Sequence, residues 1–257
     1  MNVATIVRRC NVATPHGKGT KVYLDGIRGD NFLNSIETPV TVDTAETTIF
    51  NSSNVKTYIP GNADANLAAA GMWEGSSSES DEFLSGFVGS SSPKVLNWYP
   101  DSDALGNFGF GTQVYETGYN INSPVDGVVT VSVDGQADNG KFSVESLRAL
   151  TTTNTTGSLS ATTASGTADD NSAATTSNGI GWFQRVDTST GAIVPKIQHS
   201  ANNSTWDDLI SFSSGTTRNG QRVAAGTTTI KRYTRAEWTI TGSSTLSFNF
   251  HIGFTRL

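Results

Sequence analysis

The residues that could carry out acid–base chemistry are few and lie far apart in the sequence. The three histidines, His16, His199 and His251, stand in no spacing that metal sites use, so we interpret each as a polar surface or strand residue. Asp207 and Asp208 are adjacent, which in a strand would turn their carboxylates to opposite faces. Carboxylates that face apart cannot share acid and base roles at one substrate. These residues therefore predict no catalytic site.

A second candidate is the segment DSDALGNFGFGT at residues 101–112, which begins like a calcium-binding loop. Acids occupy its first and third positions and Gly106 its sixth, as in such loops. Leu105 and Thr112 then stand at the fifth and twelfth positions, where calcium needs an oxygen ligand and a bidentate Glu. The glycines precede an expected strand, so they offer no helix N-terminus to a phosphate group. We interpret the segment as a turn.

Cys10 is the only cysteine, so the chain cannot form an internal disulfide. It has no nearby pattern of His and Asp, and we interpret it as a small buried hydrophobe rather than a nucleophile. The opening MNVATIVRRCNVATPHGKG has its two Arg residues after a short apolar run, the reverse of a secretory signal. No window approaches the ~20 apolar residues of a membrane span. The sequence predicts a soluble, non-enzymatic protein made in a cytoplasm, with no cofactor or metal.

Composition favours an all-β protein. Of 257 residues, 35% are hydrophobic and only 16% are charged, while Gly, Ser, Thr and Asn are abundant. The net charge of −6 divides unevenly, with −9 on residues 1–145 and +3 on residues 146–257. An acidic half argues against binding nucleic acid by contact, because that requires Lys and Arg to neutralise phosphates.

Alternation of apolar and polar residues predicts the strands of the first region, and turn residues separate them. These strands are expected at residues 21–24, 40–42, 94–99, 112–119 and 125–133. One short amphipathic helix is expected at about 78–88, where acids follow a serine run and Phe83, Leu84, Phe87 and Val88 repeat at helical spacing. Residues 21–150 are thus predicted to form a β-sandwich or barrel with one short helix, preceded by an arm at residues 1–20.

The composition changes at residues 151–179, where the apolar residues are almost all Ala. Such a run buries too little surface to offset its ordering entropy, so it predicts a linker, a long exposed loop or weak edge strands. We place the domain boundary at its start. Alternation then resumes, and residues 180–257 are predicted to form a second, smaller β-sandwich.

Two groups of aromatic residues indicate binding surfaces. In TTIFNSSNVKTYIPG, residues 47–61, a segment expected to be a connection contains Phe50, Tyr58, Ile59 and Pro60. These either close their own core or contact another copy of the chain. In the second region, Trp206 and Trp238 lie in a strand, turn and strand pattern that occurs in carbohydrate-binding sandwiches, where they could stack on sugar rings. The competing interpretation is that they belong to the core or an interface.

The order of these segments resembles the tail tube (major tail) proteins of long, non-contractile-tailed bacteriophages. The likeness covers residues 20–145. It rests on the "Leu-Asp-Gly" opening strand, the "Thr-Thr-Ile-Phe … Tyr-Ile-Pro-Gly" loop, the "Leu … Gly-Met-Trp-Glu-Gly" strand and, after the helix, "Ser-Pro-Val-Asp-Gly-Val-Val-Thr-Val-Ser-Val" leading into the turn at residues 137–140. The part from KIQHSANNSTWDDLISF to the C-terminus is also similar to the extra β-domain that follows the tube domain in many such proteins.

The resemblance implies a virion protein whose subunits close into hexameric rings, which stack into the tube through which DNA leaves the capsid. It implies that the loop at residues 43–66 and the arm reach neighbouring subunits, so that Phe50, Tyr58, Ile59 and Pro60 would contact another chain. Implied partners are the tape measure, tail terminator and distal tail proteins. On this interpretation the acidic balance predicts an acidic lumen that repels DNA; otherwise the acids lie on the outer wall or pair across subunits.

Two other functions remain open from the sequence. One is a phage head-decoration or adhesion protein, and the other is a non-catalytic carbohydrate-binding β-sandwich.

Overall fold

The computed structural model describes residues 17–49, 55–75, 81, 84–138, 145–157, 162–176, 178–226, 228–242 and 246–257. The protein is nearly all β, with 59% strand and 4% helix, which confirms the predicted fold class. Within the described residues, no helix has the length and apolar character needed to cross a membrane.

The first half of the chain forms the N-terminal unit. It contains the 3₁₀ turns η1 (Gly17–Gly19) and η2 (Gly29–Asn31) and the strands β1 (Lys21–Leu24), β2 (Ile27–Arg28), β3 (Leu33–Glu37), β4 (Val40–Glu46), β5 (Tyr58–Met72), β6 (Lys94–Tyr99), β7 (Phe108–Asn122) and β8 (Thr130–Ala137). The second half forms the C-terminal unit. It contains β9 (Glu145–Gly157), β10 (Thr162–Ser165), β11 (Asp169–Asp170), β12 (Gly179–Arg185), β13 (Ala192–Ser200), β14 (Asp207–Ser211), β15 (Asn219–Ala224), β16 (Tyr233–Thr241) and β17 (Leu246–Arg256).

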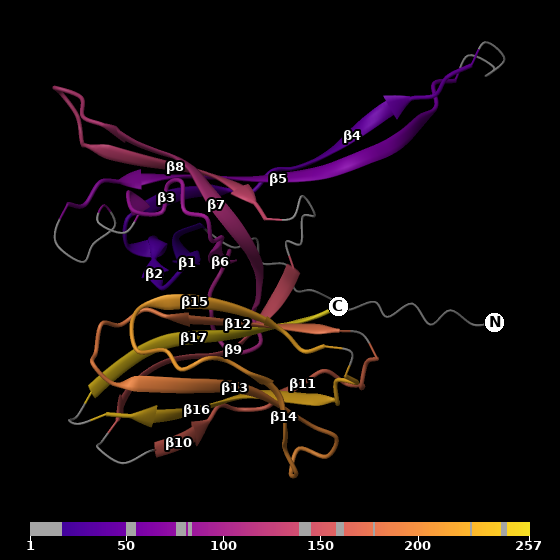
Figure 1. Ribbon diagram of the computed structural model, residues 1–257, viewed down its shortest axis with the longest axis vertical. Coiled ribbons are helices and arrows are strands. Elements are labelled where there is room, and N and C mark those ends of the chain that lie inside the picture. The colour runs from indigo at the N-terminus through magenta and orange to yellow at the C-terminus, as the bar shows by residue number, and fades with distance from the viewer. Residues whose placement is uncertain are drawn as a thin grey trace.

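One twelve-stranded sheet runs through both units, as Figure 1 shows. Its main path is β15-β12-β17-β9-β7-β6-β1-β2, and β8, β5, β3 and β4 branch from β7. A second sheet, β10-β16-β13-β14 with β11 on β16, packs against the part of the first sheet that lies in the C-terminal unit. The C-terminal unit is therefore a β-sandwich, as predicted.

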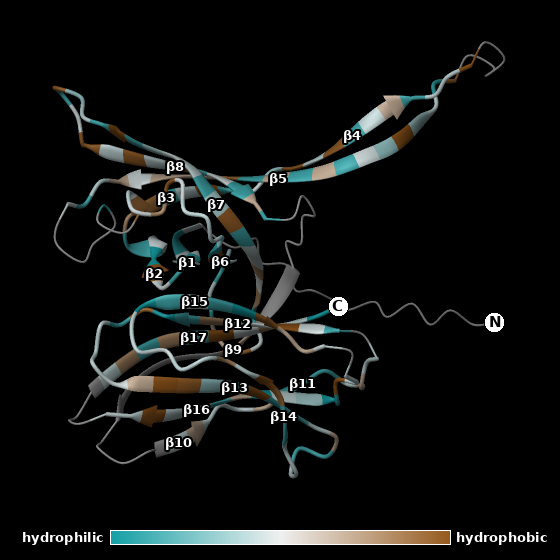
Figure 2. Cartoon of the chain, in the orientation of Figure 1, coloured by the Kyte–Doolittle hydropathy of each residue, from teal (hydrophilic) through white to brown (hydrophobic). Residues whose placement is uncertain are grey.

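The core of the sandwich lies between these two sheets, where Figure 2 shows hydrophobic stretches on the central strands. Every residue of β12 is buried, and Phe183 packs against Phe250 of β17 and Phe212. Trp238 of β16 meets Phe250 edge-on, with ring centroids 5.2 Å apart. Each such side chain contributes about 1.5–3 kcal/mol by leaving water, so this cluster dominates the stability of the unit.

The core of the N-terminal unit follows the alternation along its strands. Ala65, Leu67 and Ala69 of β5 point inward, and their neighbours point outward. Val133 of β8 and Leu96 of β6 complete the same cluster. This period of two is what a sheet with one covered face requires.

For residues 151–179 the sequence left a linker, a long exposed loop or weak edge strands open, and the described part of this segment contains strands. Strand β9 extends to Gly157, pairing first with β7 and then with β17 across nine residue pairs. β10 and β11 pair with β16. Thr is common in strands. A Thr-rich segment that lies beside other strands gains hydrogen bonds and buried surface from those neighbours, and its own composition does not reveal them. The boundary expected at residue 150 therefore lies inside a strand shared by both units.

The two units are also joined through a buried contact. Gln184 of β12 donates from Nε2 to the carbonyl of Val95 (2.9 Å) and to Oδ1 of Asn97 (2.8 Å), and its Oε1 accepts from the amide of Gly26 (2.8 Å). An apolar cluster packs beside it, formed by Tyr23, Val95, Tyr99, Ala149, Ile180, Trp182 and Val186. The C-terminal unit is thus fixed to the N-terminal unit by buried polar and apolar contacts.

Two smaller expectations are also corrected. The helix predicted at 78–88 lies partly outside the described residues; Asp81 and Leu84 are helical, but residues 85–89 form a turn. A single turn suffices there because Leu84 is buried in the core and Phe87 packs against it, while residues 85–89 return the chain toward β6. The strand expected at 125–133 begins only at Thr130, since the preceding residues form the connection between β7 and β8.

Candidate assembly surface

A β-ribbon made of β4 and the first half of β5 projects from the N-terminal unit (Figure 1). Its register pairs Val40 with Ala65 and Glu46 with Tyr58, and every residue of β4 is exposed. Beyond the strands, the amide of Thr47 donates to the carbonyl of Thr57 at 2.8 Å. The ribbon is therefore a hydrogen-bonded strand pair with one register shift, between Val42 and Thr44, and it is largely open to solvent.

Large apolar side chains of this ribbon are at least half exposed. They are Val40 (50%), Val42 (50%), Ile49 (69%), Val55 (61%), Tyr58 (53%) and Ile59 (55%). A two-stranded ribbon is marginally stable in water by itself, and exposed apolar patches mark interaction sites. Its geometry and composition both suit a segment that another chain covers.

The structure gathers three of the four predicted contact residues on this ribbon. Tyr58, Ile59 and Pro60 are the first residues of β5 and are exposed, whereas Phe50 lies outside the described residues. The loop expected at residues 43–66 is corrected, because most of it is strand. Pro60 has no amide hydrogen to donate to a neighbouring strand, so within a sheet proline is confined to edges and bulges. Here it pairs with Thr44, next to the register shift between Val42 and Thr44.

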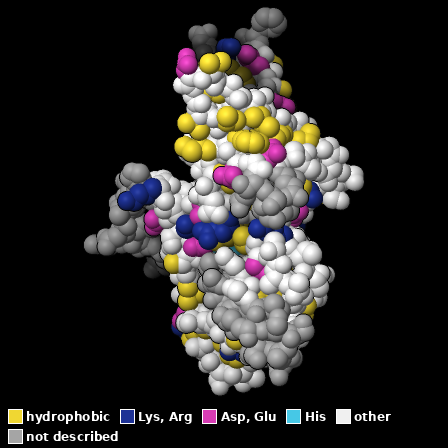
Figure 3. Space-filling model, turned by 90° about the vertical axis from the view of Figure 1, so that its left-hand side faces the viewer, with side chains coloured by type: hydrophobic (Ala, Val, Ile, Leu, Met, Phe, Trp, Pro, Cys, Tyr) yellow, Lys and Arg dark blue, Asp and Glu magenta, His cyan; other side chains and the backbone are white. Residues whose placement is uncertain are grey.

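A second apolar projection is the hairpin between β7 and β8, which sequence reasoning missed. Val125 is fully exposed, Val128 is 63% exposed and Ile121 is 45% exposed. On the face shown in Figure 3, hydrophobic side chains gather on the upper part of the molecule. The sequence did contain a sign of this hairpin. The dipeptides Ser-Pro and Asp-Gly directly before and after Val125 are typical of a turn and not of a strand.

The sheet that joins these two projections carries acids and no bases. Strands β3, β4, β5, β7 and β8 contain no Lys or Arg. Their exposed acids are Glu37, Asp43, Glu46, Asp64 and Asp134. Figure 3 shows Lys and Arg side chains mainly in a band lower down on this face. Five of the acids of residues 1–145 are thus exposed on these strands, and one of them, Glu46, pairs with Lys56 beyond the strands at 3.1 Å.

An open groove of about 540 Å³ runs along β3. All five residues of β3 line it, together with Gly17, Lys18 and Thr20, which follow directly on residues 1–16. In the described residues β3 pairs only with β5, so its other edge is open. Such an edge can accept a further strand. Most of the predicted arm, residues 1–16, lies outside the described residues.

The two tryptophans proposed for sugar stacking differ in accessibility. Trp238 is only 7% exposed and packs in the sandwich core, so it cannot present a face to a sugar; this expectation is corrected. Trp206 is half-buried, and the guanidinium of Arg235 lies 4.2 Å from its ring centroid. That arginine also donates to Gln198 at 2.8 and 3.0 Å, which holds it over the ring.

The remaining candidates for chemistry are structural in the described residues. In the segment at 101–112 the turn is confined to residues 105–106, where Gly106 has φ +82°, and β7 begins at Phe108. Asp103 accepts a hydrogen bond from Tyr23. His199 is buried, and this burial lowers its pKa; His251 is fully buried, and His16 lies outside the described residues. Asp207 pairs with Lys231, and Asp208 pairs with Lys196. No group of three or more His, Cys, Asp or Glu suited to a metal occurs in the part of the chain that the structure describes.

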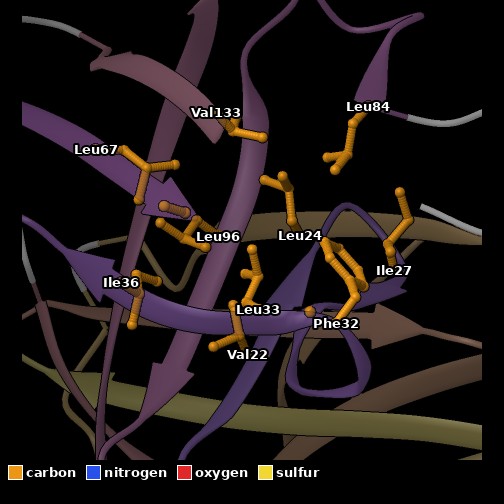
Figure 4. A pocket seen from close by; sticks show the side chains of 12 residues that line it. Val22, Leu24, Ile27, Phe32, Leu33, Ile36, Leu67, Leu84, Leu96 and Val133 are labelled. Carbon is orange, nitrogen blue, oxygen red and sulfur yellow. The ribbon is translucent and has the colours of Figure 1, made fainter. Parts of the chain in front are cut away.

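An apolar cavity in the N-terminal core is too small for a ligand. Its volume is about 20 Å³, and Figure 4 shows Leu24, Leu67, Leu84 and Leu96 among the side chains that point into it. A dry cavity of this size is ordinary packing space.

Comparison with known proteins gives no family for the chain. No protein-family model matches it, and no curated protein matches it. Among solved structures it is similar to a chain of the virion of a native gene transfer agent particle, with 13% identity and a TM-score of 0.40 over 48% of this chain and 94% of that one. It is also similar to the SPP1 Dit protein, with 9% identity and a TM-score of 0.35 over 92% of this chain and 98% of that one. A chain of the phage p2 baseplate is similar with 10% identity and a TM-score of 0.31 over 91% of this chain and 97% of that one. Likenesses this weak carry no argument about function.

Proposed function

We propose that this protein is the repeating subunit of a phage tail tube, in which copies close into hexameric rings that stack around a channel for DNA. The observation that carries the proposal is the projecting ribbon of β4 and β5, which exposes apolar residues on a strand pair without a covering layer. The order of sequence elements over residues 20–145, which resembles tail tube proteins, supports the same function.

The two apolar projections lie at opposite ends of one strand. The ribbon begins at Tyr58, and at the other end of β5 Met72 pairs with Thr130, next to the β7–β8 connection. Fifteen residues of strand separate them by about 50 Å. Contact between different ends of successive copies is head-to-tail, and head-to-tail contacts close into rings when the rotation allows it.

The acid-bearing sheet suits the wall of a DNA channel. A wall without Lys or Arg offers no partner to phosphates, and its carboxylates repel them. This repulsion is screened within ~8 Å at physiological salt, so it acts on DNA that fills the hole closely. We assign this sheet to the lumen, and the C-terminal unit, which is fixed behind it, to the outer side of the ring.

The groove along β3 is the surface that we assign to the arm, residues 1–16 of a neighbouring copy. The arm would add to the open edge of β3 as the rings stack. Its sequence has no acids and contains Arg8 and Arg9, which complements the acidic N-terminal unit. The ends of the assembled tube would contact the tape measure, tail terminator and distal tail proteins, and the protein would be part of the virion.

Assembly of the purified chain tests the proposal. Negative-stain microscopy and sedimentation at rising concentration should show rings or tubes with a central hole. Replacing Tyr58 and Ile59 by Asp should leave a folded monomer. The matched control is Leu105→Asp, another exposed apolar residue, which should assemble like the wild type.

Two outcomes would contradict the proposed function, and a third would contradict only the contact assigned to the ribbon. Discrete trimers would favour a head-decoration or adhesion protein, and a sugar-dependent shift in migration would favour carbohydrate binding. Normal tubes from the double variant would exclude the ribbon as the contact.

A further inference from the structure

Glu116 is a buried carboxyl group without a partner. It lies in β7 and is 5% exposed, and neither of its side-chain oxygens has a hydrogen-bond partner. It lines a void too small for water together with Leu24, Leu67, Val114 and Val133. A carboxylate left unpaired in such a place is strongly unfavourable, so the group remains protonated unless its surroundings change.

The turn at residues 85–89 covers this part of β7. The amide of Gly89 approaches the carbonyl of Glu116 at 3.5 Å, and the amide of Phe87 donates to the carbonyl of Leu84 at 3.0 Å. Leu84 and Phe87 both pack on the N-terminal core. The turn therefore packs on the same core and contacts the main chain of β7 at Glu116.

Lys94 connects the turn, the carboxyl group and the junction between the units. Its Nζ lies 4.3 Å from the ring centroid of Phe87 and 3.3 Å from Asp25, and it also lines the void beside Glu116. Asp25 accepts a hydrogen bond from the amide of Gly220 at 3.1 Å, in the C-terminal unit. One ammonium group thus lies within reach of two carboxyl groups.

Few other charged groups lie around Glu116. β1 and β5 contribute only Leu24 and Leu67 to the void. The titratable groups near it are Lys94 on β6, Asp134 on β8, Tyr119 on its own strand and Asp81 at the start of the covering turn, which accepts from Tyr119 at 2.5 Å.

We propose that Glu116 and Lys94 form a protonation-controlled latch for the turn at residues 85–89. With Glu116 protonated, Lys94 stays over Phe87 and paired with Asp25, and the turn stays closed. When Glu116 loses its proton, the buried negative charge draws Lys94 away from Phe87 and Asp25. The turn then opens for two reasons. It loses the cation–π contact between Lys94 and Phe87, and the new ion pair between Lys94 and Glu116 is stabilised by water that enters when the turn opens.

The protonation range agrees with this geometry. Burial raises the pKa of Glu116 to about 8, against the smaller lowering effect of Lys94. The folded protein therefore holds this proton at neutral pH and releases it as the pH rises through about 8. The closed turn is the neutral-pH state, and the open turn is the alkaline state.

Hydrogen exchange of the full chain between pH 6 and 9.5 tests the latch. After correction for intrinsic exchange, opening of the segment that contains Phe87 and Gly89 should increase at least tenfold in the wild type. It should change less than twofold in Glu116→Gln, which keeps the shape but cannot ionise. Amides of β16, far from the turn, serve as the internal reference and should not change.

A titration of the wild type alone gives a second test if the variant fails to fold. With ¹³C-labelled Glu, the side-chain carboxyl of Glu116 and the amides of residues 87–89 should titrate with one midpoint. The latch is excluded if these midpoints differ, if Glu116→Gln opens like the wild type, or if β16 opens in parallel. None of these readings requires assembly, so they leave the tube proposal unaffected.

Discussion

The hydroxyl of Tyr99 on β6 lies 2.6 Å from Nε2 of His251 on β17, and both residues are fully buried. The ring of His251 also stacks on Tyr23, with centroids 5.1 Å apart. This buried contact between Tyr99 and His251 joins the two units. Its contribution to stability can be tested by removing the hydroxyl oxygen of Tyr99.

Tyr99→Phe should lower the free energy of unfolding by about 1–3 kcal/mol, because it leaves a buried imidazole nitrogen without this partner. Urea unfolding measures the loss. Tyr115→Phe is the control, since Tyr115 is on the same sheet and half-buried, and it should change stability by less than ~0.5 kcal/mol. Equal effects of the two variants would show that the contact with His251 contributes nothing.

Gly26→Ala should destabilise the protein more than Gly226→Ala. Both glycines have positive φ, +88° and +67°, so both substitutions incur backbone strain of about 1–2 kcal/mol. At Gly26 the new Cβ would also lie 2.5 Å from the carbonyl oxygen of Arg185, whereas at Gly226 nothing lies within 4 Å. Thermal melts compare the two, and a larger shift for Gly226→Ala would contradict the close docking of the β1–β2 turn.

A chain ending at Leu150 should be insoluble. The truncation removes the strands that cover Tyr23, Val95 and Tyr99, all of which are buried in the complete protein. Exposed apolar surface of this kind promotes aggregation. Expression and gel filtration of the truncated chain check this, and a soluble, folded monomer would restore the independent domain that the sequence suggested.

Asp187→Asn should cost about 3–5 kcal/mol at pH 7, because it removes the carboxylate that pairs with the fully buried Arg185 at 2.9 Å. Burial raises the pKa of Asp187, but hydrogen bonds from Arg185 and Ser189 outweigh this and hold the pKa below its usual range. The contribution is therefore present at neutral pH and is lost as the pH falls below about 4.

Melting curves at pH 7 and pH 3 measure the Asp187 effect, which should shrink in acid. Asp170→Asn is the matched control, since Asp170 pairs with Arg232 at the surface, and its melting temperature should barely change. A difference between wild type and Asp187→Asn that is as large at pH 3 as at pH 7 would refute the pairing argument.

If the chain forms the tube that we propose, replacing Asp64 and Asp134 by Lys should slow DNA ejection from assembled particles, more at low salt than at high salt. Both residues are exposed on the base-free sheet, and Lys would add attraction to phosphates. Ejection kinetics at two salt concentrations measure the effect. If the Lys variant ejects DNA at the normal rate at low salt, the acids do not face the lumen and belong to the outer wall.

Local sequence patterns predicted the parts of the fold that depend on local alternation. The strands expected at residues 21–24 and 94–99 have the same bounds in the structure. Both are short apolar runs ended by turn residues, and one face or both are buried. The all-β class followed from the same patterns.

The parts that were mispredicted depend on contacts distant in the sequence. β9 is rich in Thr and pairs with β7 and β17, which lie outside any local sequence window around it. Gln184 and Asn97 meet across 87 residues of sequence. The partner that fixes a strand or a polar side chain cannot be identified from composition alone.

The candidate surface was partly predictable. Tyr58 and Ile59 stood out because apolar residues in a polar connection are unusual, and both side chains are more than half exposed, whereas their contact with another chain stays a prediction. Trp238 followed the same pattern as Trp206 but points into the sandwich, because alternation along β16 places it on the inner face. Glu116 gave no signal, since the side chains around it come from strands distant in the sequence, among them Leu24 of β1 and Leu67 of β5.

Strand β9 pairs with β7 along its first part and with β17 along the rest of its length. This arrangement restricts where residues can be inserted or deleted during evolution. Extra residues in the β4–β5 or β7–β8 connections would extend a projection and leave every pairing intact. One extra residue between Leu150 and Thr151 would leave the first part of β9 paired with β7 but shift the second part by one step against β17. Related sequences should therefore differ in length at the hairpin tips and agree in length through β9.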